Sequence, residues 1–432
     1  MDRRKGGDRL MAADDRDGRA YTTLGIVAVG QGGGNIAIQF LTRKDNPGID
    51  ERVVLVNTND TDIMRNIDRN ESDLAIDRET LSREHVETFG GASVGVGNDF
   101  FEGERLAEED FETIFRPINN KISGSEALMY SVALGGGSGN GSVPYIIDQL
   151  SQGPDGGKTA DMNAAWLDGI TQFALAAWPF DYESAQRHYN AICGLSRLLM
   201  REDGEPNADM TILASNTRLK ELALQDDEDD VRQDSRGDYV DDKTLVNERI
   251  IDAIDLFISA GRLSESTIDV KDYVEKPQLH GAYHGTFGTA MEKPTGLDID
   301  LAIESAVENA FVPLDPSTAK AAYVIVRAPE RKMQSGEVTM GRVGEGFAKW
   351  KAENGLRGTV GMETLAQAPG RRNSMDVLVF LAGFDLGPLF EESWEFYETE
   401  KEGLRRGEST DQLARVKRIE ENLRQYRNRL EE

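Results

Sequence analysis

The sequence predicts an α/β fold with a doubly wound parallel sheet, then a long central helix, then a smaller α+β domain. Short continuous apolar segments alternate with amphipathic segments of helical length, as buried parallel strands alternate with crossover helices. The apolar segments are 24–29, 53–56, 128–134, 171–177 and 210–214. Several of them run into loops rich in glycine, asparagine, serine or threonine. Because open α/β sheets bind ligands beyond the carboxyl ends of their strands, these loops predict a binding site there.

The chain has 432 residues, which is too many for one ordinary core. We expect a disordered, charged N-terminal arm, a nucleotide-binding domain, a central helix, a C-terminal α+β domain and a helical tail. The expected boundaries are, in that order, 1–20, 21–242, 243–262, 263–388 and 389–432. In the α+β part, 301–311 predicts a helix, 321–326 and 375–381 predict strands, and 331–372 is expected to include exposed loops. The acid-rich stretch 226–242 is expected to be a solvated loop or helix entry.

The formal net charge is −28 at pH 7. A surface this acidic repels nucleic acid and anionic membranes, so neither is an expected partner. The acids are spread along the chain, which favours adaptation to a salt-rich cytoplasm over an acidic patch for a basic partner. A single cysteine, Cys193, excludes an internal disulfide. We expect no direct membrane insertion and a cytoplasmic location, because no apolar run reaches membrane-spanning length and residues 1–20 lack the apolar core of a secretory signal.

The stretch 135–141 is the strongest local signal in the chain. It reads Gly135, Gly136, Gly137, Ser138, Gly139, Asn140 and Gly141, between a buried strand and the helical pattern 143–150. Glycines let backbone N–H groups approach a ligand, and a helix N-terminus carries partial positive charge. This predicts a phosphate-binding loop, the alternative being a flexible glycine loop. No lysine is present, so it is not a Walker A loop. Pro144 is expected in the first helical turn.

A second glycine stretch follows the first predicted strand. It consists of Gly30, Gln31, Gly32, Gly33, Gly34 and Asn35. Asn35 stands where a dinucleotide-binding fingerprint needs glycine, and the next strand ends in Asn57 and Thr58, without an acidic ribose partner. A nucleotide site is therefore favoured over a nicotinamide site. A third loop, with Gly95, Gly97 and Asn98, is also glycine-rich and free of lysine.

Polar residues elsewhere have alternative interpretations. Glu183 and Arg187 are four residues apart, as in a helix-surface ion pair or a ligand contact. Asn247, near the start of a long apolar helix, is either a hydrogen-bonded core amide or a residue that faces a base. Asp269 and Asp272 could cap a helix, activate water or bind a cation.

Taken together, these segments resemble the tubulin/FtsZ superfamily of self-assembling GTPases, clearly over about 24–275 and weakly to about 386. Residues 135–141 resemble its GGGTGTG signature, with Ser138 and Asn140 in place of threonines. Segments 30–35, 57–58 and 95–98 resemble its other nucleotide loops, and 179–187 resembles the PFxFE…R segment of FtsZ. The resemblance implies ribose contact by Glu183, a position near the nucleotide for Arg187, and guanine recognition by Asn216 and Asn247.

The resemblance also implies a mechanism. Asp269 and Asp272 match the NxDxxD loop, with Thr267 in place of its asparagine. In the family this loop reaches the nucleotide site of the next subunit and positions the attacking water. The implied cofactors are GTP or GDP with Mg²⁺ or K⁺, for which no metal-ligating residues are assigned. The implied partner is the protein itself, as a homopolymer, with unknown cytoskeletal or division partners also possible.

The expected function is therefore a GTP-binding, GTP-hydrolysing filament protein of divergent archaeal FtsZ-like or CetZ-like type. One alternative is a tubulin-like structural protein that binds guanine nucleotide, hydrolyses it poorly and forms no long filaments. A more distant alternative is a dinucleotide-dependent oxidoreductase. Near the C-terminus, Val416, Ile419, Leu423, Tyr426 and Leu430 form a short heptad seam, which we expect to pack on the protein's own surface.

Overall fold

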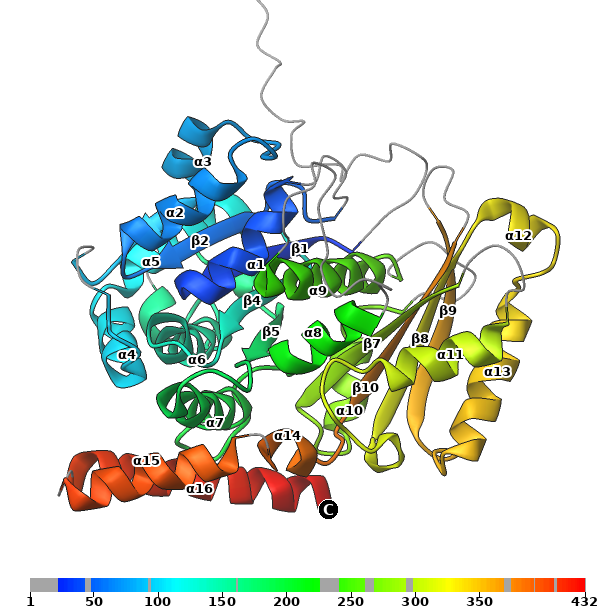
Figure 1. The fold of residues 1–432 in the computed structure, drawn as a ribbon. Helices are drawn as coiled ribbons and strands as arrows, with labels where there is room; N and C mark the ends of the chain where they lie inside the picture. Colours follow the sequence, from blue (N-terminus) through cyan, green and yellow to red (C-terminus); the bar gives the residue numbers. More distant parts are fainter. Residues whose placement is uncertain are drawn as a thin grey trace, which may run out of the picture.

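The computed structural model describes residues 22–42, 48–91, 95–160, 162–225, 241–260, 268–292, 298–368, 374–391, 393–407 and 410–431. Within them, one sheet of ten strands runs through the molecule in the order β3-β2-β1-β4-β5-β6-β7-β10-β8-β9. The strands from β3 to β7 are parallel, β10 is antiparallel to both neighbours, and β8 and β9 are parallel to each other. Figure 1 shows the helices packed around this sheet. The predicted fold class is confirmed.

The strands are β1 (Leu24–Val29), β2 (Val53–Asn57), β3 (Val86–Thr88), β4 (Ala127–Ala133), β5 (Thr171–Trp178), β6 (Met210–Ser215), β7 (His284–Glu292), β8 (Ala321–Ala328), β9 (Val360–Gln367) and β10 (Met375–Ala382). The first helices are α1 (Gly30–Thr42), α2 (Asp60–Asn70), α3 (Arg78–Glu84), α4 (Phe100–Glu109), α5 (Phe111–Ile122), α6 (Ser138–Ser151), α7 (Ala185–Leu199) and α8 (Asn216–Gln225). The later helices are α9 (Asp242–Ile258), α10 (Asp272–Gln278), α11 (Ile299–Glu308), α12 (Glu330–Gln334), α13 (Met340–Glu353), α14 (Gly387–Glu391), α15 (Trp394–Arg406) and α16 (Thr410–Glu431).

The central strands are buried on both faces, which is why they read as continuous apolar runs. In β1, Val27 and Val29 join one core, shared with α4 to α7, while Ile26 and Ala28 join a second core, shared with α1, α2 and α9. Helix α9 belongs to the second core together with side chains of β8 and β10. It therefore connects the N-terminal half of the sheet to the C-terminal half.

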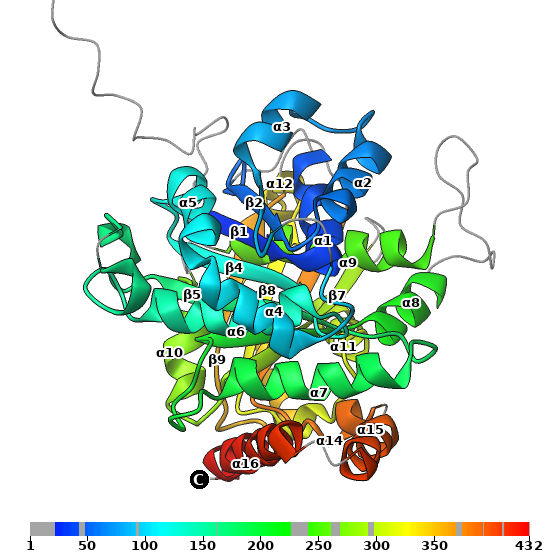
Figure 2. The ribbon, with the colours of Figure 1, turned by 90° about the vertical axis from the view of Figure 1, so that its left-hand side faces the viewer.

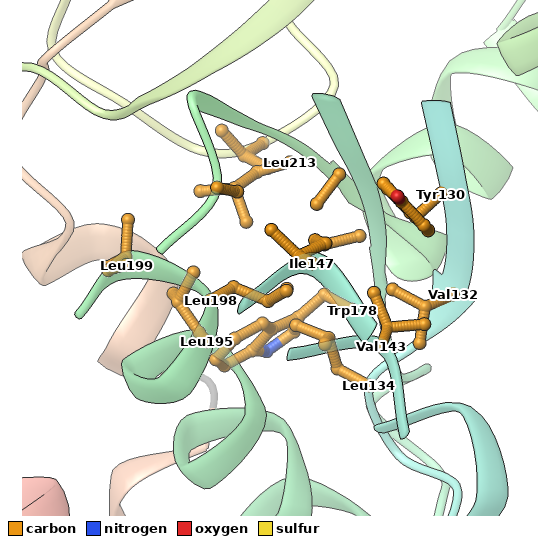
Figure 3. Close-up of a cluster of buried hydrophobic side chains, with 14 of the residues drawn as sticks. Tyr130, Val132, Leu134, Val143, Ile147, Trp178, Leu195, Leu198, Leu199 and Leu213 are labelled. Carbon is orange, nitrogen blue, oxygen red and sulfur yellow. The ribbon is translucent and has the colours of Figure 1, made fainter. Parts of the chain in front are cut away.

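The core beneath α6 and α7 fixes the position of the glycine segments. Figure 3 shows Val132 of β4 and Val143 and Ile147 of α6 close to Trp178 and to leucines of α7, and all of these side chains are buried. Because α6 begins at Ser138, directly after Gly137, packing of its apolar face holds its N-terminus at the end of β4.

The strands predicted in the first half are confirmed within one residue at each end, but β7 was not predicted. Strand β7 contains Gly285 and Gly288, which interrupt the apolar pattern. A Cβ at Gly285 would lie 2.5 Å from the Phe380 ring, and one at Gly288 would lie 2.1 Å from the carbonyl oxygen of Ala306. Close packing thus requires glycine at both positions, and the same glycines interrupt the apolar pattern that would have predicted the strand. Since β7 pairs with both β6 and β10, it joins the two halves into one sheet.

The stretch 331–372 includes an exposed loop at 335–337, as expected, and its described part also contains most of α12 and all of α13 and β9. The predicted helix 301–311 begins and ends earlier, at Ile299 and Glu308, where Asp298 caps its N-terminus. The arm 1–20, the acidic stretch up to residue 240 and Thr267 lie outside the described residues. The division into domains stays a prediction.

The C-terminal helices α15 and α16 pack against α7, as both ribbon views show (Figures 1 and 2). Val416, Ile419 and Tyr426 of the heptad seam are buried, so the seam does pack on the protein's own surface. Ser393 links the same region to the body, because its hydroxyl hydrogen-bonds Trp178 Nε1 at 2.9 Å and His188 Nδ1 at 2.7 Å. The described helices include none that is long and apolar enough to cross a bilayer.

Candidate functional site

The segments that follow the parallel strands converge on one cavity of about 300 Å³. Most of the predicted site residues line it. They are Gly30, Gln31, Gly32, Asn35, Asn57, Gly95, Gly97, Asn98, Gly135, Gly136, Gly137, Ser138, Gly139, Glu183, Arg187, Asn216 and Asn247. Gly33, Gly34, Asn140, Gly141, Asp269 and Asp272 are not among the lining residues. Chain segments far apart in sequence thus meet at the carboxyl edge of the sheet, where α/β folds bind ligands.

Two helix N-termini open at this cavity. Helix α1 begins at Gly30 and α6 begins at Ser138, so much of each glycine stretch is the first helical turn and not a loop. The expected place of Pro144 in a first turn was wrong for the same reason, because α6 starts six residues earlier. The first N–H groups of a helix have no intrahelical acceptor, and they carry the positive end of the helix dipole. The cavity is therefore suited to an anion such as phosphate.

Several glycines are needed for packing between these two helix starts. A Cβ at Gly32 would lie 2.3 Å from Ala133 Cβ, and one at Gly139 would lie 2.3 Å from the carbonyl oxygen of Val29. Such distances are far inside van der Waals contact, so even alanine would force the backbones apart. The predicted role in ligand approach therefore accounts for only part of the glycine pattern.

Gly33, Gly34 and Gly141 lie behind the cavity wall. A Cβ at Gly33 would be 2.0 Å from the carbonyl oxygen of Ser131, and one at Gly141 would be 2.0 Å from that of Phe100. At Gly34 the nearest atom is Asn66 Nδ2, at 3.4 Å. The close contacts at Gly33 and Gly141 explain these two glycines without a ligand.

The side chain of Asn140 is also part of the framework. It is fully buried, and its Nδ2 donates hydrogen bonds to the carbonyl oxygens of Leu134 at 2.7 Å and Asn190 at 2.8 Å. A Cβ at Gly194 would collide with its amide oxygen. Asn140 therefore joins the end of β4 to α7.

Asn190 is a framework residue that the sequence analysis did not single out. It is fully buried in α7, and its Nδ2 lies within hydrogen-bond distance of the carbonyl oxygens of Asn98 at 2.8 Å, Gly135 at 3.2 Å and Gly136 at 3.4 Å. A single amide thus holds two of the lining loops. Its position three residues after Arg187, within one helical turn, was the signal that could have found it.

The loop 95–98 is shaped by two left-handed residues, with φ of +58° at Gly97 and +65° at Asn98. Glycine and asparagine tolerate this region best, which explains the pair. The loop packs close to the main glycine run, since a Cβ at Gly137 would lie 2.5 Å from Val96 Cγ2. Thr58 and Ser138 both line the cavity, and their hydroxyls share a hydrogen bond of 2.7 Å.

Glu183 and Arg187 form the ion pair that their spacing allows, with 3.1 Å between Oε1 and Nη1. Both residues also line the cavity. The two interpretations of this pair are thus compatible, because an ion pair at a cavity wall holds the guanidinium in place without removing its remaining donors.

Two side-chain amides and an aromatic ring also line the cavity. Asn216 begins α8, Asn247 lies on α9 and Phe180 follows β5. Asn247 Nδ2 donates a hydrogen bond to the carbonyl oxygen of Asn35 at 3.2 Å. Asp62 and Lys243 also line the cavity and were not predicted.

Asp269 and Asp272 lie together at the start of α10. The backbone N–H of Asp269 donates to Asp272 Oδ2 at 2.9 Å, and Asp272 Oδ1 pairs with Lys276 Nζ at 2.9 Å. Asp269 is exposed and Asp272 is half-buried. Within one chain this pair therefore does not form part of the cavity wall.

A family model described as "Tubulin/FtsZ family, GTPase domain" matches residues 23–223. Residues 23–223 are a tubulin/FtsZ family domain. The cell division protein FtsZ of Methanothermobacter thermautotrophicus is 29% identical over 200 residues, which is 46% of this chain and 42% of that protein. FtsZ 1 of Archaeoglobus fulgidus is 24% identical over 317 residues, covering 68% of this chain and 75% of that protein.

Solved structures agree on the fold well beyond the tubulin/FtsZ family domain. GDP-bound CetZ1 of Haloferax volcanii has a TM-score of 0.65 at 19% identity, over 88% of this chain and 99% of that one. CetZ2 of the same organism, solved as a GTPγS-bound protofilament, has a TM-score of 0.62 at 20% identity, over 87% and 99%. A GTPγS-form protofilament of TubZ from Bacillus thuringiensis serovar israelensis has a TM-score of 0.64 at 15% identity, over 90% and 95%. The predicted resemblance to the tubulin/FtsZ superfamily is confirmed for residues 23–223, and the CetZ and TubZ structures show that the fold extends over most of the chain.

The cavity offers donor groups that suit a nucleotide. The glycine segments and helix N-termini supply backbone N–H groups, and the side chains of Asn216 and Asn247 supply amides. The described residues offer no comparable site for a metal cation, because they hold no group of three or more His, Cys, Asp or Glu side chains that could bind one. Asp62 is a single carboxylate at the wall. The ligand roles of individual residues stay predictions.

Proposed function

We propose that this protein binds and hydrolyses GTP and assembles head to tail into filaments. The observation that carries the proposal is the split between two sites on one chain. The glycine and amide segments gather around one cavity, while Asp269 and Asp272 lie outside its wall. A heterologous head-to-tail contact, repeated from copy to copy, would bring the acid pair of one subunit to the cavity of the next.

The roles of the residues follow from this arrangement. Backbone N–H groups of 30–32, 95–98 and 135–139 hold the phosphates, and Glu183 and Arg187 contact the ribose side. Asn216 and Asn247 read the base. A Mg²⁺ or K⁺ ion that entered with the nucleotide would supply positive charge to the phosphates, and Asp62 is the one carboxylate besides Glu183 among the described lining residues. Asp269 and Asp272 of the neighbouring subunit orient and deprotonate the attacking water, so that hydrolysis requires assembly.

One observation favours a second candidate, a guanine-nucleotide protein that hydrolyses slowly. Asp272 is held within its own chain by Lys276 and by the N–H of Asp269. These contacts hold the carboxylate toward its own chain and compete with a contact to water in a neighbouring subunit.

The deciding experiment measures GTP turnover against protein concentration, together with sedimentation in GTP and in GDP. Both are run at high and low salt, because a net charge of −28 opposes self-association when it is unscreened. The proposal expects turnover per subunit to rise with concentration and GTP to promote sedimentation. A near-zero rate at every concentration, with GTP bound, would favour the second candidate.

The Asp272→Asn variant tests the acid pair directly. It should bind GTP and sediment as the wild type does, while turnover falls by about 100-fold or more, as expected for loss of a general base. Glu275→Gln is the matched control, since Glu275 is an exposed acid on the same helix. Wild-type turnover in Asp272→Asn would remove this residue from the proposed mechanism.

A further inference from the structure

Lys243 lines the cavity beside the amides, although no glycine segment contains a lysine. It lies four residues before Asn247 on α9, so the two side chains share one helix face, one turn apart. Within the described part of the chain, no carboxylate pairs with its ammonium group, whereas Arg187 is paired with Glu183.

The proposed function assigns the base to Asn216 and Asn247, and Lys243 lines the cavity one helical turn from Asn247. The helix N-termini of α1 and α6 and the loop 95–98 supply the part of the lining that the proposed function assigns to the phosphates. Asn216, Asn247 and Lys243 come instead from α8 and α9. A cation for the triphosphate would be expected among the glycine segments, as in a Walker A loop, and not one turn from an amide of α9.

Helix physics does not account for a lysine at this position. Lys243 is the second residue of α9, where the helix dipole favours acids, and Asp241 and Asp242 beside it follow that rule. Because Lys243 departs from the helix-dipole preference and lies at a cavity wall, its side chain is expected to have a function.

We propose that Lys243 is a specificity-determining residue that donates hydrogen bonds to O6 and N7 of guanine. The inference rests on the proposed function and adds a base-reading group to it. Guanine presents two acceptors on this edge, whereas adenine presents N7 and an amino donor in place of O6. An ammonium group therefore matches guanine and opposes adenine, while Asn216 and Asn247 are left to the Watson–Crick edge.

The test measures equilibrium affinities of the wild type and of Lys243→Met for GTP, ITP, 7-deaza-GTP and ATP by calorimetry. Methionine keeps the length of the side chain and removes its charge and donors. We expect Lys243→Met to lower the affinity for GTP and ITP about tenfold, since both carry O6 and N7, and to leave the affinity for ATP unchanged. The loss should be smaller for 7-deaza-GTP, which lacks N7. Lys243→Arg, which keeps donors and charge, should restore most of the affinity for GTP.

Lys220→Met is the matched control. Lys220 pairs with Asp242, next to Lys243, but does not line the cavity. Its removal changes the local charge equally, and we expect the ratio of GTP to ATP affinity to stay at the wild-type value. Equal losses for GTP and ATP in Lys243→Met would show a phosphate contact and overturn the inference, as would no loss at all. A wild-type protein that binds none of these nucleotides would overturn the proposed function itself.

Discussion

Asn190 donates a hydrogen bond from its side-chain amide to the carbonyl oxygen of Gly135, over 3.2 Å. The same amide reaches Gly136 O at 3.4 Å and Asn98 O at 2.8 Å. In a planar trans peptide, C=O and the next N–H point in opposite directions. Holding the Gly136 carbonyl toward α7 therefore turns the N–H of Gly137 away from α7, and Gly137 lines the cavity.

The Asn190→Ala variant should lower both stability and nucleotide affinity. It leaves buried carbonyl oxygens without their donor, so we expect a loss of about 2 kcal/mol in the free energy of unfolding. The freed loops should also lose their preset orientation, weakening GTP binding about tenfold or more. Chemical denaturation and calorimetry measure the two effects.

Asn207→Ala separates the two effects in this experiment. Asn207 is a buried amide of the same kind, with Nδ2 bonds of 2.9 Å to Pro144 O and Arg197 O, and it does not line the cavity. Asn207→Ala should lower the free energy of unfolding by about as much as Asn190→Ala and leave the affinity for GTP unchanged. If Asn190→Ala lost stability alone, like its control, then the orientation of the loops would not depend on Asn190.

Alanine substitutions at two glycines should give opposite results. Gly33→Ala places a Cβ 2.0 Å from Ser131 O, and overpacking of this kind costs about 1–3 kcal/mol or more. Gly136→Ala meets nothing closer than Ala133 O at 3.6 Å, but Gly136 lines the cavity. We therefore expect Gly33→Ala to lower the melting temperature strongly, and Gly136→Ala to fold normally and bind GTP more weakly. A stable Gly33→Ala protein would contradict the packing role of that glycine.

These contrasts show how much of the site the sequence could predict. A glycine run that follows an apolar strand predicts a site at the sheet edge, because strand ends and helix starts are set by local patterns. It does not say which glycines face the ligand. Gly33 and Gly136 look alike in sequence, but packing of α1 against β4 places Gly33 behind the wall, whereas Gly136, in the turn between β4 and α6, lines the cavity.

Residues outside the glycine pattern were harder to find. Asn190 and Lys243 lie on helices whose faces the sequence does not orient relative to each other, so their place at the cavity depends on tertiary packing. Strand β7 was missed because Gly285 and Gly288, which close packing requires, remove the apolar alternation that identifies a strand.

Acidification should destabilise the protein through its buried histidines. Burial lowers the pKa of His284 to about 4, from an ordinary value of 6.5. The ring is held neutral between Tyr426, whose hydroxyl lies 2.5 Å from Nδ1, and Phe384 O, 2.9 Å from Nε2. Below pH 6.5 the His284 side chain binds a proton in the unfolded chain, whereas in the folded chain it stays neutral until about pH 4. The free energy of unfolding should thus fall by about 3 kcal/mol between pH 6.5 and pH 4 from this group.

Comparison with His284→Gln isolates this contribution from the many carboxylates that titrate in the same range. The difference in stability between wild type and variant should shrink as the pH falls from 6.5 to 4. His280→Gln is the matched control, because His280 is an exposed histidine just after α10, and it should follow the wild type. Burial also lowers the pKa of His85 and His188, which adds to the same trend. A constant difference across this range would mean that His284 titrates normally.

Mixing two inactive variants should restore hydrolysis if the acid pair acts on a neighbouring subunit. Asp272→Asn keeps an intact cavity, whereas a bulky Gly136→Trp fills the cavity and keeps Asp269 and Asp272 intact. Each should be inactive alone. In an equal mixture, random head-to-tail contacts place an intact cavity against an intact acid pair about one time in four, so turnover should reach about a quarter of the wild-type rate. The recovery should rise with protein concentration and disappear in GDP. A mixture that co-sediments yet stays inactive at every ratio would mean that Asp272 does not act across the contact between subunits.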